Sequence, residues 1–159
     1  MIRSVAPESV AVDGFHALAP HVCETYAEFG YPADRIDVIP NILDETFLVE
    51  HPSDFSAPYR LLYVGELSRK KGVDRFPALL KRLNTSGREC TLTVIGEGGL
   101  RSELGQSLSD SGLESLVEFR GRLPNDQLPN VYAAHDVFVY PGRWDEPFGR
   151  VFLESLAAG

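Results

Sequence analysis

Two carboxylates near the end of the sequence, Glu146 and Glu154, have seven residues between them. A strand-like run at residues 137–140 precedes them, and Gly149 marks a turn into a helix that would carry Glu154. A strand, a loop and a helix in this order form the layout of a binding site at the edge of a parallel sheet. Because a carboxylate has two acceptor oxygens, it suits a ligand with two neighbouring hydroxyl groups.

Each carboxylate also has a simpler interpretation. Glu154 follows Arg150 at the spacing of a solvent-facing ion pair on a helix. Glu146 would merely stabilise the helix dipole, which contributes less than about 1 kcal/mol at an exposed site. The two residues therefore indicate a candidate site, and the elements around them must decide its use.

From Arg60 onward, strand-like and helix-like segments alternate. The continuous apolar run at residues 61–64 is typical of a strand buried on both faces of a parallel sheet. Similar short runs follow at 91–95, 117–119 and 137–140, with helical spacing between them. This pattern predicts an α/β fold with a parallel sheet of about four strands.

The first part of the chain reads as a separate strand–helix–strand unit at residues 15–39, with a helix that begins near Pro20. Residues 41–59 contain Pro, Ser, Asp and His without clear periodicity. We interpret them as a linker, and this linker is the best candidate for a domain boundary.

Composition excludes several classes of function. The 159 residues carry a net charge of −8, which argues against a general nucleic-acid binder. The sequence has no apolar run of membrane-spanning length, and its start lacks the apolar core of a signal peptide. Cys23 and Cys90 fit no metal spacing and are expected to be free thiols, while His135 is expected to be structural. We predict a cytoplasmic protein without a metal site, and leave open a peripheral position at the membrane.

Four short signatures occur in a fixed order: Ile39-Pro40-Asn41; Val64-Gly65 followed by Lys71-Gly72; Ile95-Gly96-Glu97-Gly98; and Glu146-Pro147-Phe148-Gly149 followed by Glu154. As an ordered set they resemble the retaining nucleotide-sugar glycosyltransferases with two facing Rossmann-like domains (family 4, or group 1). The resemblance implies that residues 1–50 are the C-terminal part of the acceptor-side domain plus the linker. Residues 51–159 would be the Rossmann-like donor-binding domain, truncated at its C-terminus.

The resemblance assigns the two carboxylates different roles. Glu154 would accept hydrogen bonds from the ribose hydroxyls, and Glu146 would contact the donor sugar. Backbone N–H groups of Phe148 and Gly149 would face the diphosphate, because a helix N-terminus supplies donors and a positive dipole end. Lys71 would neutralise the diphosphate leaving group, whose charge grows in the transition state. Glu146 and Lys71 are thus the candidate catalytic residues.

The other candidates act through the backbone. Gly65, Gly96 and Gly98 would allow close approach to the nucleoside, and Leu123 lies in a segment whose backbone reads the base.

One position departs from the family pattern. Glu66 stands where an arginine often shares the diphosphate, and a carboxylate there would repel the phosphates. Either Arg69, Lys70 or Arg143 substitutes for that arginine, or donor binding is weakened.

The predicted function is transfer of a sugar from a nucleotide diphosphate-sugar, as substrate and without a cofactor, to an unknown glycan, lipid or small molecule with retention of configuration. The 159-residue chain alone is expected to bind a nucleotide weakly and not to transfer sugar. A truncated, non-catalytic nucleotide- or partner-binding module is an alternative, which Glu66 favours. A sugar-nucleotide epimerase is a second, but its acid and base groups are not found. The strand at 137–140 would be flanked by strands that this sequence lacks, which predicts self-association through an open edge.

Overall fold

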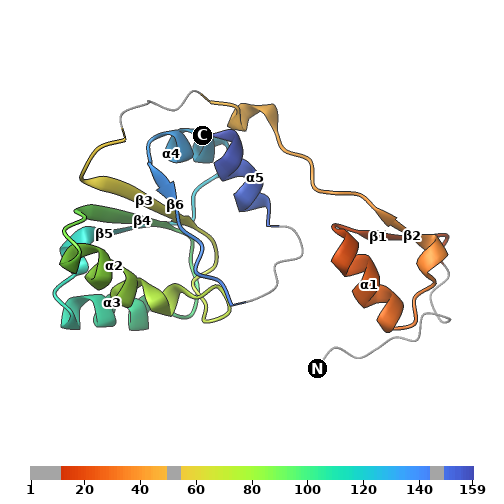
Figure 1. Cartoon of the computed structure of the whole chain (residues 1–159), viewed down its shortest axis with the longest axis horizontal. Coiled ribbons are helices and arrows are strands. Elements are labelled where there is room, and N and C mark those ends of the chain that lie inside the picture. The colour runs from red at the N-terminus through yellow and green to blue at the C-terminus, as the bar shows by residue number, and fades with distance from the viewer. Residues whose placement is uncertain (1–11, 50–54, 144–148) are drawn as a thin grey trace. The chain divides into compact units, whose positions relative to one another are not determined.

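The computed structural model describes residues 12–49, 55–143 and 149–159 (Figure 1). Within them the chain forms two compact units: one contains the residues up to Leu43 together with Gly149 and Arg150, and the other contains the residues from Asp44 to Arg143 and Val151–Gly159. Each unit has its own parallel sheet.

The first unit is the strand–helix–strand motif that the sequence predicts. Strand β1 (Phe15–Ala17) pairs in parallel with β2 (Ile36–Val38), and helix α1 (Pro20–Glu28) lies between them in the chain. Pro20 begins α1, where its missing N–H is not needed. Gly30, with a φ of 86°, lets the chain turn after the helix.

The second unit is built on a four-stranded sheet in the order β5-β4-β3-β6, with every pair parallel. Strand β3 (Tyr59–Val64) lies between β4 (Cys90–Ile95) and β6 (Val137–Phe138), and β5 (Val117–Gly121) forms the other edge. This arrangement confirms the predicted parallel α/β fold.

The edge strand β6 is shorter than the strand predicted at 137–140. The nitrogen of Val139 still donates to the carbonyl of Leu62 at 2.8 Å, but Tyr140 leaves the ladder. Pro141, which follows, has no N–H to continue it. The expectation that this strand is flanked only by strands outside the sequence is wrong on one side, because β6 pairs with β3.

Helices cover both faces of this sheet (Figure 1). Helices α2 (Phe76–Thr85) and α3 (Arg101–Asp110) lie on one face, and α4 (Leu128–Ala133) and α5 (Arg150–Ala157) lie on the other. Strand side chains alternate between the two faces of the sheet. Because helices cover both faces, the strand residues on each face are mainly apolar. Short 3-10 helices lie at the connections: Ala33–Arg35, Glu45–Phe47, Val73–Arg75, Glu114–Leu116 and Asn125–Gln127.

Asp136 ties the connection before β6 to the start of β3. Its carboxylate accepts from the backbone nitrogen of Arg60 at 2.7 Å and from the Arg60 guanidinium at 2.6 and 3.0 Å. The nitrogen of Asp136 donates in return to the Arg60 carbonyl at 2.8 Å. Since the Asp136 side chain is only 1% exposed, this pairing fixes the register of β6 from inside the fold.

Candidate functional site

A cavity of about 260 Å³ lies at the carboxyl ends of the central strands of the second unit. This edge of a parallel sheet is where ligands bind in open α/β folds. Its walls come from the ends of β3 and β4, the segment after β5, and α4: Val64, Gly65, Glu66, Ile95, Gly96, Glu97, Arg122, Leu123 and Leu128.

Glycines allow the loops around this cavity to approach one another closely. The nitrogen of Gly65 donates to the carbonyl of Ile95 at 3.0 Å, and the nitrogen of Gly96 donates to that of Gly121 at 2.7 Å. Gly96 has a φ of 128°, and a Cβ there would collide with the Gly65 carbonyl. The structure therefore brings together three residues singled out from the sequence, Gly65, Gly96 and Leu123.

Gly98 has a different place. A Cβ on Gly98 would collide with the backbone of Leu67, whose nitrogen donates to the Glu97 carbonyl at 2.9 Å. The Leu67 carbonyl accepts from the nitrogen of Leu100 at 3.0 Å. Gly98 thus permits two loops to pack, and it is not among the residues that line the cavity.

The charged part of the cavity wall consists of Glu66, Glu97 and Arg122. Two carboxylates beside one guanidinium make this wall formally negative. Arg122 directly follows β5 and Glu97 is the second residue after β4, so their positions in the chain could have identified them. Leu128 gives no such signal, because its place in the wall depends on how α4 packs.

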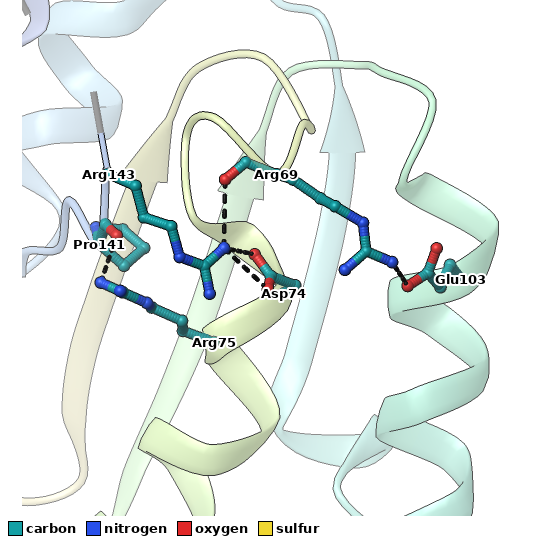
Figure 2. Close-up of polar contacts among 6 residues, drawn as sticks. All are labelled: Arg69, Asp74, Arg75, Glu103, Pro141 and Arg143. Carbon is teal, nitrogen blue, oxygen red and sulfur yellow. Dashed lines mark hydrogen bonds and ion pairs between the residues drawn. The ribbon is translucent and has the colours of Figure 1, made fainter.

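Arg143 ties the segment after β6 to the loop after β3 (Figure 2). Its guanidinium donates to both carboxylate oxygens of Asp74, at 2.8 and 3.0 Å, and to the carbonyl of Arg69 at 3.3 Å. Arg75 adds a bond to the carbonyl of Pro141 at 3.1 Å, and Arg69 pairs with Glu103. Figure 2 shows the Arg143 guanidinium directed at Asp74 and the Arg69 guanidinium directed at α3. Two of the three cations proposed to replace the missing arginine are therefore paired with carboxylates.

Lys71 lies in the same loop. Its Nζ donates to the hydroxyl of Tyr140 at 3.1 Å and lies 5.6 Å from the centre of that ring. Neither Lys71 nor Arg143 is among the residues that line the cavity. Among the described residues, Lys71, the cation predicted to bind the diphosphate, therefore lies beside Tyr140 in the segment after β6 and not in the cavity wall.

Glu154 is buried, with 4% of the residue exposed. Its Oε2 accepts a hydrogen bond at 3.0 Å from the hydroxyl of Tyr132, which is also 4% exposed. Burial, followed by the charge of Glu154, raises the pKa of Tyr132 above its ordinary value. The interpretation of Glu154 as a solvent-facing carboxylate is therefore wrong, and Tyr132 is a partner that the sequence analysis did not identify.

Two further candidates, Glu146 and Phe148, lie outside the described residues. Gly149 is described and directly precedes α5. Among the residues at 12–49, 55–143 and 149–159, no group of three or more His, Cys, Asp or Glu side chains could hold a metal ion. Within the same ranges, no helix is both long enough and apolar enough to span a bilayer.

Residues 49–159 match the protein family described as glycosyl transferases group 1. A 2-deoxystreptamine glucosyltransferase from Streptomyces kanamyceticus is 29% identical over 144 residues, which are 84% of this chain and 37% of the relative. A glycogen synthase from Mycobacterium tuberculosis is 35% identical over 134 residues, which are 82% of this chain and 32% of the relative.

A similar solved structure is HepE from Anabaena in complex with UDP and glucose. It has a TM-score of 0.77 and 25% sequence identity, over 92% of this chain and 42% of HepE. The chain spans about a third of the length of these curated relatives.

Proposed function

The chain belongs to the glycosyl transferases group 1 family, and from this premise we propose that it contains the donor-binding part of an enzyme that transfers a sugar from a nucleoside-diphosphate sugar. The cavity at the carboxyl ends of β3 and β4 carries the proposal, because its wall combines glycine backbone and an apolar surface with a few charged side chains. HepE, which shares this fold, holds UDP and glucose in its complex.

In this proposal the nucleoside occupies the cavity. Gly65 and Gly96 expose backbone to it without side chains, and Leu123 and Leu128 give the base an apolar surface. Glu154 accepts from the ribose hydroxyls, for which its two oxygens are suited.

The diphosphate lies toward the β6 side, where Lys71 is held against the neutral phenol of Tyr140. We assign Lys71 to the leaving group, because it lies in the loop after β3 and its Nζ is held at the hydroxyl of Tyr140. The family resemblance also assigns the backbone N–H groups of Phe148 and Gly149 to the diphosphate.

Glu146 orients the donor sugar in this scheme. The reaction proceeds on one face of the sugar with retention, and the leaving diphosphate helps to deprotonate the incoming hydroxyl. The acceptor is a glycan, a lipid or a small molecule. An inverted anomeric centre in the product would contradict retention.

The donor assignment is tested by titration calorimetry of the 159-residue chain with UDP-, GDP- and ADP-glucose. We expect weak binding with a preference for one base. Lys71→Ala should weaken binding about 10- to 100-fold, since a hydrogen bond to a charged group contributes about 1.5–3 kcal/mol.

Lys81→Ala is the matched control, because Lys81 is an exposed lysine on α2. Absence of heat with all three donors would favour a non-catalytic interaction module. Equal weakening by the two substitutions would remove Lys71 from the phosphate site.

A further inference from the structure

We propose that Tyr132 is a positioning residue, whose phenol holds the Glu154 carboxylate in the orientation that accepts the ribose hydroxyls. This inference rests on the proposed function, in which Glu154 binds the ribose. It adds a residue on α4 that acts through Glu154 and does not itself need to touch the nucleotide.

The contact between the two residues joins two helices on the same face of the sheet. The Tyr132 hydroxyl lies 3.0 Å from Glu154 Oε2, and the two residues are separated by 22 positions in the chain. Both are 96% buried, so water does not compete freely for this bond. A hydrogen bond to a buried carboxylate is short-ranged and directional, and it therefore restricts how the carboxylate can rotate.

The phenol is a fixed donor. Burial and the neighbouring carboxylate raise the pKa of Tyr132, so the hydroxyl stays protonated across the physiological range. A protonated phenol donates one hydrogen bond to Oε2 and does not take a proton from a ligand hydroxyl. Tyr132 is thus suited to orienting the carboxylate rather than to acid–base chemistry.

The ring of Tyr132 is itself held in place. Phe47 packs against it edge-on, with ring centres 6.0 Å apart, and Phe138 of β6 lies at the same distance. Phe47 is fully buried. Leu128, one helical turn before Tyr132 on α4, lines the cavity. Helix α4 therefore connects the wall of the cavity to the orientation of Glu154.

An apolar pair would satisfy the contact between α4 and α5 at lower cost. Replacing both partners of a buried hydrogen bond by apolar groups of the same shape can be nearly neutral or stabilising. The neighbours Phe47 and Phe138 make this environment mainly apolar. We infer that the polar pair is kept for ligand binding.

Tyr132→Phe removes only the hydroxyl, and UDP and 2′-deoxy-UDP are the probes in calorimetric titrations of the full 159-residue chain. The native chain should bind UDP more tightly than 2′-deoxy-UDP. In Tyr132→Phe, affinity for UDP should fall about 3- to 10-fold, as expected for the net contribution of one typical hydrogen bond, with a smaller change for 2′-deoxy-UDP, which keeps only one of the two hydroxyls. The ratio of the affinity for UDP to the affinity for 2′-deoxy-UDP therefore falls. If Tyr132 were purely structural, its loss would weaken the binding of both ligands alike and leave the ratio unchanged.

Tyr59→Phe, the same chemical change on β3, should leave the ratio unchanged. Glu154→Gln should lower it further, and the double variant should match Glu154→Gln, because Tyr132 acts only through Glu154. Phe47→Leu, which keeps the hydroxyl but loosens the ring, should give an intermediate ratio.

An unchanged ratio in Tyr132→Phe, with UDP still bound by the native chain, overturns this inference alone. Failure of the native chain to distinguish UDP from 2′-deoxy-UDP overturns the ribose role of Glu154 and this inference with it.

Discussion

His135 uses both ring nitrogens inside the second unit. Its Nδ1 donates to the carbonyl of Val131 at 2.6 Å, and its Nε2 lies 2.8 Å from the hydroxyl of Thr93 and accepts from it. A carbonyl can only accept, so in the neutral ring the proton lies on Nδ1. The residue joins α4 to β4, which is the structural role predicted from its position beside a strand.

This environment makes folding stability depend on pH. Burial lowers the pKa of His135, and the positive charges of Arg120 and Arg60 act in the same direction, although the Val131 bond and Asp136 oppose them. The unfolded chain has an ordinary histidine pKa of about 6.5. As pH falls below that value, the unfolded state binds the proton first, so stability decreases at a rate that cannot exceed about 1.4 kcal/mol per pH unit for one group.

We therefore expect urea unfolding to show a loss of stability between pH 7.5 and 5.5 that is smaller in His135→Asn. His21→Asn, at an exposed histidine of α1, should retain the native dependence. An identical pH dependence in the native chain and His135→Asn would contradict this assignment.

Single residues also show where sequence reasoning stops. Gly65 and Gly96 could be placed correctly because each directly follows a predicted strand, and strand ends meet at one edge of a parallel sheet. The burial of Glu154 could not be predicted, because it depends on Tyr132 from a different helix. The spacing from Arg150 to Glu154 predicts an exposed pair equally well.

The loop after β3 is held tightly against the segment after β6. Gly72 has a φ of 75°, and a Cβ there would collide with the carbonyl of Pro141. Gly87, after α2, has nearly the same φ, 73°, but a Cβ there would meet nothing within 4 Å. An alanine at either position would adopt a left-handed backbone, but only at Gly72 would its Cβ also clash. Comparing the two substitutions therefore distinguishes the cost of the clash from the cost of the backbone conformation.

We expect Gly87→Ala to cost about 1–2 kcal/mol of unfolding free energy, which is the usual penalty for a left-handed alanine. Gly72→Ala should cost at least about 2 kcal/mol more, because the loop must also move away from Pro141. Urea unfolding of the two variants measures the difference. Equal costs would show that the loop after β3 yields without resistance.

The elements themselves were largely predictable, since their apolar runs reflect burial on both faces of the sheet. The point at which β6 ends was not predictable, because Tyr140 leaves the ladder to contact residues that are distant in the sequence. That residue directs its ring to Phe152 on α5, with ring centres 4.7 Å apart, and its hydroxyl to Lys71. Such long-range contacts are not encoded in local periodicity.

Strand β6 forms an edge of the sheet beside an apolar cavity of about 520 Å³. Val137 of β6 lines this cavity together with residues of β3 and α2. Among the described residues, β6 pairs with β3 alone. An apolar edge of this kind is a template for pairing with another chain.

Self-association therefore remains our prediction, measured by light scattering after size exclusion as a mass that rises with concentration. Val137→Lys should reduce it, since a lysine on an edge strand opposes pairing. Ile42→Lys is the control, because Ile42 is an exposed apolar residue, 88% exposed, in the other unit. A constant monomer mass for the native chain at high concentration would exclude association through this edge.

The bond between Arg60 and Asp136 also bears on the order of folding. It joins residues 76 positions apart, whereas β3, β4 and β5 follow one another along the chain. The entropy lost on closing a flexible loop grows with its length, by about 0.6 kcal/mol for each doubling, and contacts between distant residues slow folding. The three consecutive strands can therefore assemble first, and β6 docks late. During synthesis, residues 136–138 leave the ribosome after β3, β4 and β5. Until then β3, which is a central strand of the finished sheet, is itself an open edge.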